Sequence, residues 1–150
     1  MAHTYSNLLV HALFSTKKRA PLLDAELKVE LFSYMGGIIA QLRGKPILIG
    51  GPKDHVHLLF VLPCSLSVAD LMEKVKANSS KWVKNRWQNR SHFAWQTGYT
   101  AFSVSQSNLE SVKRYIASQE THHRRITFQE EVLAFLKKHE IAYDPRYVLD

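Results

Sequence analysis

Cysteine is almost missing from this chain of 150 residues, and its scarcity excludes two kinds of structural support. Cys64 is the single cysteine, so no internal disulfide can form and no Cys-x-x-Cys pair is available for structural zinc. Because Cys64 follows Pro63 at the end of an apolar run, we expect it to be a small buried residue. Any bound metal must be held by histidine, carboxylate or amide groups.

Long apolar runs are also missing. No stretch approaches the roughly 20 residues that cross a bilayer, and the opening residues MAHTYS lack the basic start and apolar core of a secretory signal. We therefore expect a cytoplasmic protein without membrane contact. The sequence has no repeat, linker or low-complexity segment, and its length is typical of a single domain, so we expect residues 1–150 to form one domain.

Acidic residues are in deficit. The chain has 20 Lys and Arg against 13 Asp and Glu, which gives a formal net charge of +7. A surplus of this sign favours a polyanionic partner. Nucleic acid is the first candidate, and an anionic membrane surface is the second.

The order of predicted elements indicates an α+β fold. Apolar patterning, turn residues and capping signals predict strands at 5–14, 47–49, 56–62 and 99–104, and helices at 23–42, 67–87, 107–119 and 127–138. Ser67 and Ser107 are the predicted caps of two of these helices. The order βαββαβ is the ferredoxin-like arrangement, an antiparallel sheet with helices on one face, here extended by two C-terminal helices. This fold alone fixes no activity.

His55 and His57 stand at the start of the third predicted strand. The strand period of two directs both imidazoles to one face, while Val56 points to the other. The run 58–62 is apolar on both faces, which is typical of a central strand, so the histidines lie at its polar mouth beside Asp54. Two nitrogens could then converge on one ion. Taken alone, a His-x-His pair more often consists of ordinary surface or core histidines.

Tyr115 and Gln119 lie one helical turn apart on the helix that follows Ser107. A rotation of about 100° per residue separates them by roughly 40°, so they share one face. Leu109, Val112 and Ile116 form the neighbouring apolar stripe, which would hold the pair over the histidines. An isolated tyrosine here is usually a boundary residue with a hydrated hydroxyl.

Taken together, these groups suit phosphoryl chemistry. Two imidazoles and the amide oxygen of Gln119 would hold a divalent ion, Mg²⁺ or Mn²⁺, with positions open for phosphate oxygens. Three neutral ligands predict weak, exchangeable binding. A phenol with a solution pKa near 10 is a poor nucleophile, but Tyr115 positioned in line could attack phosphorus. The resulting ester would retain the energy of the phosphodiester, so rejoining would need no ATP.

A basic, aromatic helix forms the third candidate feature. Cations can track phosphates, and exposed aromatics can stack on unpaired bases. The alternative is a solvated helix whose tryptophans belong to the core. We predict nucleic-acid contacts from this helix, from the turn after the first strand and from a clamp near His122 and His123; the residues are Lys74, Lys76, Lys81, Lys84, Arg86, Lys17, Lys18, Arg19, Arg124 and Arg125.

Four ordered motifs resemble those of one family. They are Phe14-Ser15-Thr16-Lys17; Asp54-His55-Val56-His57-Leu58-Leu59 with Pro63; residues 98–105, GYTAFSVS; and Tyr115-Ile116-Ala117-Ser118-Gln119 with His122-His123. In this set the chain resembles the single-tyrosine HUH transposases of small bacterial insertion sequences and their repeat-associated relatives. Thr100 stands where many relatives have glycine.

The resemblance implies roles for individual residues. His55 and His57 would be metal ligands, Gln119 the third ligand, and Tyr115 the nucleophile that forms a 5′-phosphotyrosine link. The partner would be single-stranded DNA with hairpin ends. The resemblance also implies a homodimer, in which the tyrosine helix acts on its own site or on that of the partner.

Two other classes of protein fit part of the pattern. A non-catalytic module that binds single-stranded DNA or RNA would explain the charge and the fold equally well. A histidine-ligated metallohydrolase for small phosphate esters would explain the metal site, but it leaves Tyr115 and the positive charge without a use.

Overall fold

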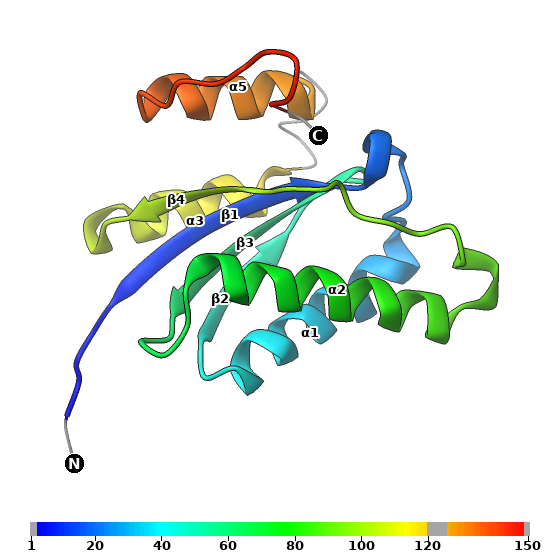
Figure 1. The fold of residues 1–150 in the computed structure, drawn as a ribbon, viewed down its shortest axis with the longest axis horizontal. Coiled ribbons are helices and arrows are strands. Elements are labelled where there is room, and N and C mark those ends of the chain that lie inside the picture. Colours follow the sequence, from blue (N-terminus) through cyan, green and yellow to red (C-terminus); the bar gives the residue numbers. More distant parts are fainter. Residues whose placement is uncertain (1–2, 120–125, 149–150) are drawn as a thin grey trace.

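The computed structural model describes residues 3–119 and 126–148. Within these residues, four antiparallel strands form one sheet in the order β2-β3-β1-β4, with helices on both of its faces (Figure 1). In chain order the elements are β1 Leu8–Ser15, α1 Ala25–Gln41, β2 Lys45–Gly50, β3 His55–Leu62, α2 Val68–Arg86, β4 Thr100–Val104, α3 Leu109–Ala117 and α5 Phe128–Lys138. Short 3-10 turns occupy Lys17–Arg19, Gln88–Arg90 and Gln106–Asn108.

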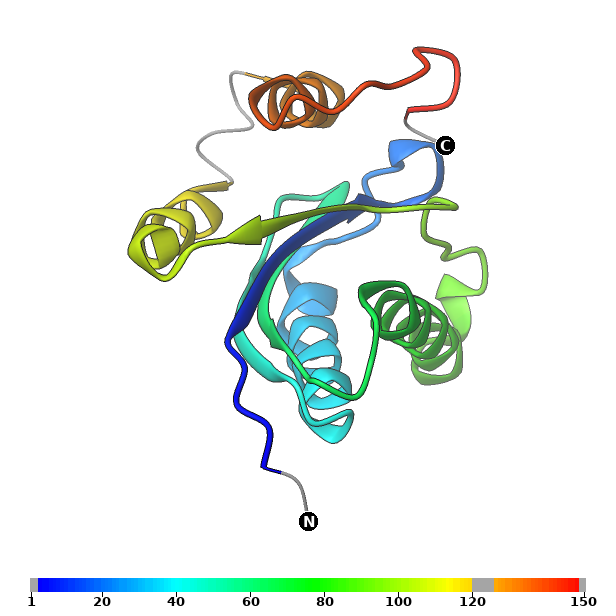
Figure 2. The same ribbon diagram turned by 60° about the vertical axis from the view of Figure 1, so that its left-hand side comes forward.

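This architecture confirms the predicted fold. The first six long elements follow the order βαββαβ, and α1 and α2 cover one face of the sheet, while α3 and α5 lie on the other side (Figure 2). The two C-terminal helices are therefore not a simple extension of the fold, because they enclose the second face of the sheet.

Each face of the two central strands belongs to its own apolar cluster. Phe14, Val56 and Leu58 point into the main core under α1 and α2. Leu13, the neighbour of Phe14, points the opposite way and packs with Phe128 and other residues of α5. Because successive strand residues alternate between faces, an unbroken apolar run in β3 is expected in a strand that is covered on both sides. The sheet order places β3 inside the sheet, as predicted.

Local capping signals were partly correct. The Ser67 hydroxyl accepts a hydrogen bond from the Asp70 backbone nitrogen at 3.1 Å and starts α2. Thr127 and Glu130 form a reciprocal capping box at the start of α5. The predicted box at Ser107 is wrong: a 3-10 turn precedes α3, and the Ser107 hydroxyl bonds the Ser105 hydroxyl instead.

Two further expectations need correction. The first strand starts at Leu8 rather than at Tyr5, whose side chain is 91% exposed. Cys64 is exposed and not buried, because β3 ends at Leu62 and the following residues form a surface turn. Within the described ranges, no helix is long and apolar enough to cross a membrane.

Candidate active site

His55 and His57 face the layer formed by α3 and α5. Both side chains are completely buried, and their ring centroids lie 5.2 Å apart. The turn before them requires a close approach of the backbone, since a Cβ atom at Gly51 would collide with the carbonyl oxygen of His55. Glycine at this position lets β3 begin at the first histidine. The alternation of the strand then directs both imidazoles toward the layer of α3 and α5.

Each imidazole is held by a partner at its Nδ1 atom. Asp54 Oδ1 lies 2.7 Å from His55 Nδ1, and His11 Nε2 lies 2.8 Å from His57 Nδ1. A carboxylate accepts hydrogen bonds, so His55 Nδ1 carries a proton. Partners of this kind fix the tautomer of a ligating histidine and direct the other nitrogen toward the ion.

The pKa values of His11 and His55 are shifted in opposite directions. Burial, and then the neighbouring His57, lower the pKa of His11 to about 3, against an opposing effect of Glu131. Burial also lowers the pKa of His55, but hydrogen bonds with Asp54 and Glu131 outweigh it, so this pKa lies above its ordinary value. His11 is thus a neutral hydrogen-bonding group, whereas His55 interacts with two carboxylates.

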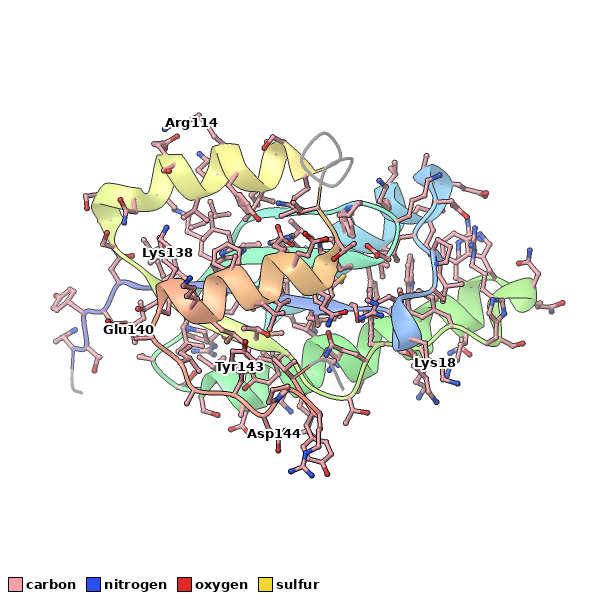
Figure 3. All side chains as sticks on the ribbon, turned by 90° about the horizontal axis from the view of Figure 1, so that it is seen from above. Lys18, Arg114, Lys138, Glu140, Tyr143 and Asp144 are labelled. Carbon is pink, nitrogen blue, oxygen red and sulfur yellow. The ribbon has the colours of Figure 1, made fainter. Side chains whose placement is uncertain are left out.

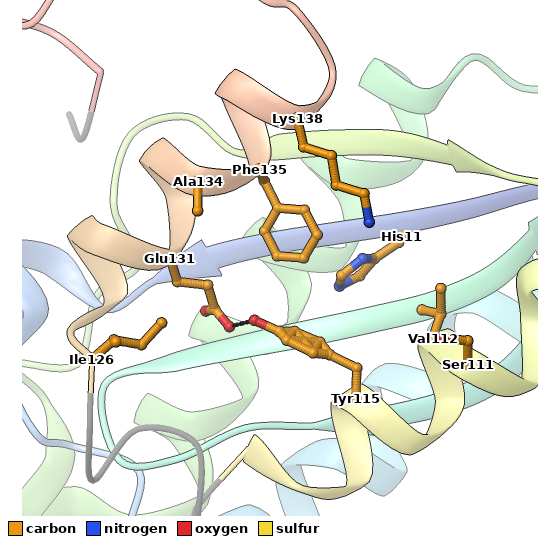
Figure 4. A pocket seen from close by; sticks show the side chains of 9 residues that line it. All are labelled: His11, Ser111, Val112, Tyr115, Ile126, Glu131, Ala134, Phe135 and Lys138. Carbon is orange, nitrogen blue, oxygen red and sulfur yellow. Dashed lines mark hydrogen bonds between the residues drawn. The ribbon is translucent and has the colours of Figure 1, made fainter.

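Glu131 of α5 lies between the two histidines and is only 1% exposed. Its Oε1 atom is 3.1 Å from His55 Nε2 and 3.2 Å from His57 Nε2. Its Oε2 atom accepts hydrogen bonds from the Tyr115 hydroxyl and from Gln119 Nε2. One carboxylate therefore connects the histidine pair to the tyrosine helix, and Figure 4 shows its contact with Tyr115.

Sequence reasoning missed Glu131, although a signal exists. The residue follows Phe128 by three positions and precedes Phe135 by four, which puts it in the apolar stripe of α5 rather than on the solvated side. Glu130 and Glu131 together look like the ordinary acidic first turn of a helix, so the local pattern does not single out Glu131. A carboxylate inside an apolar stripe is uncommon without a partner.

The helix of Tyr115 ends at Ala117, so Gln119 lies just past α3 rather than on it as predicted, yet both side chains contact Glu131. Gln119 is 1% exposed, and its Oε1 atom lies 3.3 Å from His55 Nε2. The Tyr115 ring lies 5.8 Å from that of His57. Burial, followed by the hydrogen bond to Glu131 and its charge, raises the pKa of Tyr115 above its ordinary value. Tyr115 is therefore a neutral phenol whose proton points at a carboxylate.

The donor set matches what a divalent metal requires. The ligand atoms of His55, His57 and Glu131 all lie within 4.8 Å of one another, and the Gln119 oxygen adjoins them. Imidazole nitrogens together with carboxylate and amide oxygens suit Mn²⁺ well and accommodate Mg²⁺. With Glu131 included the set is anionic, which differs from the three neutral ligands that the sequence predicted.

The residues that were predicted to contact nucleic acid lie in different parts of the structure. Lys74, Lys81, Lys84 and Arg86 are exposed on α2, which lies across the sheet from the histidines (Figure 2). Lys76 differs, because its half-buried ammonium donates to the backbone oxygens of Gln96 and Gly98. Arg124 and Arg125 lie outside the described residues.

The basic turn after β1 lies close to the histidine pair. Ser15, the last residue of β1, pairs with His55 across the sheet, and the exposed Lys17, Lys18 and Arg19 follow directly. Figure 3 looks onto the face that carries α3 and α5, and it shows Lys18 beyond the start of α5 and Lys138 near the other end of that helix. Cations therefore stand at both ends of the site.

Trp82 of α2 and Trp87, which follows the helix, pack against other aromatic rings, whereas the nucleic-acid interpretation requires exposed rings. The ring of Trp82 stacks on Tyr34 at 4.5 Å, and Trp87 meets the edge of Trp82 at 5.5 Å. Both tryptophans are partly buried against the main core. The interpretation of these residues as core residues is therefore the better one.

Comparison with known families identifies the class of protein that has this fold. Residues 4–119 match the family described as "Transposase IS200 like", and the chain belongs to this transposase family. Its members cleave and transfer DNA strands. No curated protein is similar enough to the chain to count as a match.

Two solved structures share the fold. A candidate transposase from Deinococcus radiodurans R1 has a TM-score of 0.64 and 21% identity, over 79% of this chain and 96% of its own. A REP-associated tyrosine transposase bound to a REP hairpin has a TM-score of 0.61 and 12% identity, over 84% of this chain and 74% of its own. At these sequence identities, the similarity to both structures shows a shared fold alone.

Proposed function

We propose that this transposase nicks and rejoins single-stranded DNA through a covalent phosphotyrosine link at Tyr115. One observation carries the proposal: the Tyr115 hydroxyl and the Nε2 atoms of His55 and His57 all meet the carboxylate of Glu131. A nucleophile beside a metal-binding set has the components that metal-dependent phosphoryl transfer needs.

His55 and His57 would hold the metal through Nε2, with oxygen ligands from Glu131 and Gln119. When bound, a divalent ion would neutralise and orient the phosphate oxygens. Asp54 and His11 hold the Nδ1 atoms of the two imidazoles, so both rings are already turned for ligation. Sites whose ligands need no rearrangement lose less entropy on binding.

The bond changes at phosphorus balance without a further reactant. The Tyr115 oxygen forms a bond to phosphorus while the bond from phosphorus to the 3′ oxygen breaks, which leaves a 5′-phosphotyrosine and a 3′ end that takes up a proton. The phenol proton is directed at Glu131 Oε2, a carboxylate oxygen that can receive it. The later attack of a 3′-hydroxyl reverses these changes and rejoins the strand without ATP.

The proposed substrate is single-stranded DNA beside a hairpin. Two observations support it: the REP-associated relative is bound to a REP hairpin, and this chain carries a net charge of +7. We further propose that the protein is a homodimer. Each site would use the tyrosine of its own chain, because Tyr115 contacts Glu131 of the same chain. A partner helix is then not required to complete the site.

A labelled single-stranded oligonucleotide tests this function. With Mn²⁺ or Mg²⁺ the protein should form an adduct that survives denaturing electrophoresis, and chelation should prevent it. A binding module of the same fold would retain the oligonucleotide under native conditions and form no adduct. Adduct formation in excess chelator would contradict the role of the metal.

A further inference from the structure

A cavity of about 370 Å³ opens between α3 and α5, directly beside Tyr115 (Figure 4). It does not include the histidine pair, and it shares only Glu131 with the metal-binding set. Its lining residues are His11, Ser111, Val112, Tyr115, Ile126, Glu131, Ala134, Phe135 and Lys138.

The cavity combines aromatic rings with a cation. The Phe135 ring lies 5.5 Å from that of Tyr115 and 5.4 Å from that of His11, both edge to face. Val112 and Ala134 add apolar surface, and the amine of Lys138 extends toward the same hollow. Flat apolar walls with a cation nearby are the features with which proteins hold unpaired bases of a single strand.

We propose that this cavity receives an unpaired nucleobase of the substrate strand, next to the phosphodiester that Tyr115 attacks. The inference rests on the proposed function, because the scissile phosphate must approach the Tyr115 hydroxyl, which lies in the wall of the cavity. A base attached to a neighbouring nucleotide is then within reach of the hollow. Lys138, exposed at the end of α5, would meet a phosphate of the same strand.

The cavity also offers a means of recognition that base pairing does not supply. Aromatic walls accept any base by stacking, whereas the limited volume favours a base without a paired partner. A nucleotide flanking the cleaved bond must therefore be single-stranded when it binds. This requirement would separate the cleaved strand from the paired stem of a hairpin.

A series of oligonucleotides tests the inference, each with one abasic site at a different position around the cleaved bond. With wild-type protein, one position should slow formation of the Tyr115 adduct about tenfold or more, because the stacking of one base is removed. The same position should weaken binding in fluorescence anisotropy without metal. If no position near the cleaved bond changes either quantity, the cavity holds no base.

A filled cavity gives the complementary test. Ala134 is an exposed residue of the cavity wall, so Ala134→Trp should fill the hollow without disturbing the core. This variant should react slowly with the intact oligonucleotide, and the sensitive abasic site should not slow it further, because the hollow is already filled. Ala40→Trp, the same change on the exposed side of α1, is the matched control and should react like wild type.

The outcomes separate the two proposals. A wild-type protein that forms no adduct but binds one abasic oligonucleotide more weakly would contradict the cleavage function and support the cavity. A protein that forms adducts normally, but whose Ala134→Trp variant reacts like wild type with every oligonucleotide, would contradict the cavity alone. Circular dichroism of Ala134→Trp shows whether the fold is retained.

Discussion

His11 Nε2 lies 2.8 Å from His57 Nδ1, and both side chains are buried. The contact joins neighbouring strands, since β1 and β3 pair directly and Leu13 stands opposite His57. The low pKa of His11 keeps its ring neutral, so it can form one hydrogen bond with His57 without adding charge to the site. His11 therefore acts on His57 as a positioning residue.

Replacing His11 should weaken metal binding although His11 is not a ligand. His11→Phe fills similar space but removes the hydrogen bond, so Mn²⁺ affinity measured by calorimetry should fall about 10- to 100-fold, the usual effect of losing such a partner. His92→Phe, at an exposed position, should bind Mn²⁺ normally. An unchanged Mn²⁺ affinity in a folded His11→Phe protein would remove His11 from the account.

Glu131 should contribute to metal binding directly. Glu131→Gln keeps the shape of the side chain but removes its charge, so Mn²⁺ affinity should fall by at least about tenfold. Glu140→Gln, an exposed change just past α5, provides the charge-matched control. Tighter metal binding by Glu131→Gln would contradict a ligand role, because it would mean that the carboxylate competes with the ion.

The sequence was informative where a short-range pattern fixes a direction. The period of a strand brought His55 and His57 to one face, because this relation depends only on local backbone geometry. The helical repeat was a weaker guide, because α3 ends at Ala117 and Gln119 reaches Glu131 from beyond the helix. Glu131 could not be found in this way. Its position depends on how α5 crosses the sheet, and this crossing is set by long-range contacts of Phe128 and other apolar residues.

Other differences have the same origin. The Ser107 pattern was overridden by a 3-10 turn that delays the start of α3 until Leu109. The cations of α2 are exposed for the most part, but the pattern could not tell which face of the sheet the helix covers. Lys76 was the exception, because the loop at Gln96 and Gly98 binds its ammonium.

The basic turn should contact the cleaved strand more closely than α2 does. Reversing Lys17 and Lys18 to Glu should weaken binding of a short oligonucleotide and reduce the slope of log affinity against log salt by about 0.7 for each phosphate that is no longer neutralised. Reversing Lys81 and Lys84 should affect mainly longer DNA that reaches the other face. Equal weakening on the short oligonucleotide would contradict this division.

A mixture of two inactive proteins should stay inactive. His57→Ala lacks a metal ligand, and Tyr115→Phe lacks the nucleophile. In the structure Tyr115 contacts Glu131 of its own chain, so a mixed dimer has no site with both an intact histidine pair and an intact tyrosine. Subunit exchange is verified with two affinity tags. Recovery of cleavage in exchanged dimers would show that the tyrosine helix acts on the partner subunit.

The phenol oxygen of Tyr115 is the centre of the proposed chemistry. Tyr115→Phe keeps the ring, the metal ligands and the basic surface, so it should bind Mn²⁺ and single-stranded DNA with nearly wild-type affinity. Incubated with labelled oligonucleotide and Mn²⁺, wild-type protein should yield a peptide carrying DNA at Tyr115 in mass spectrometry, while Tyr115→Phe should yield neither adduct nor cut strand. Cleavage by Tyr115→Phe would contradict the account, because it would require another nucleophile such as water.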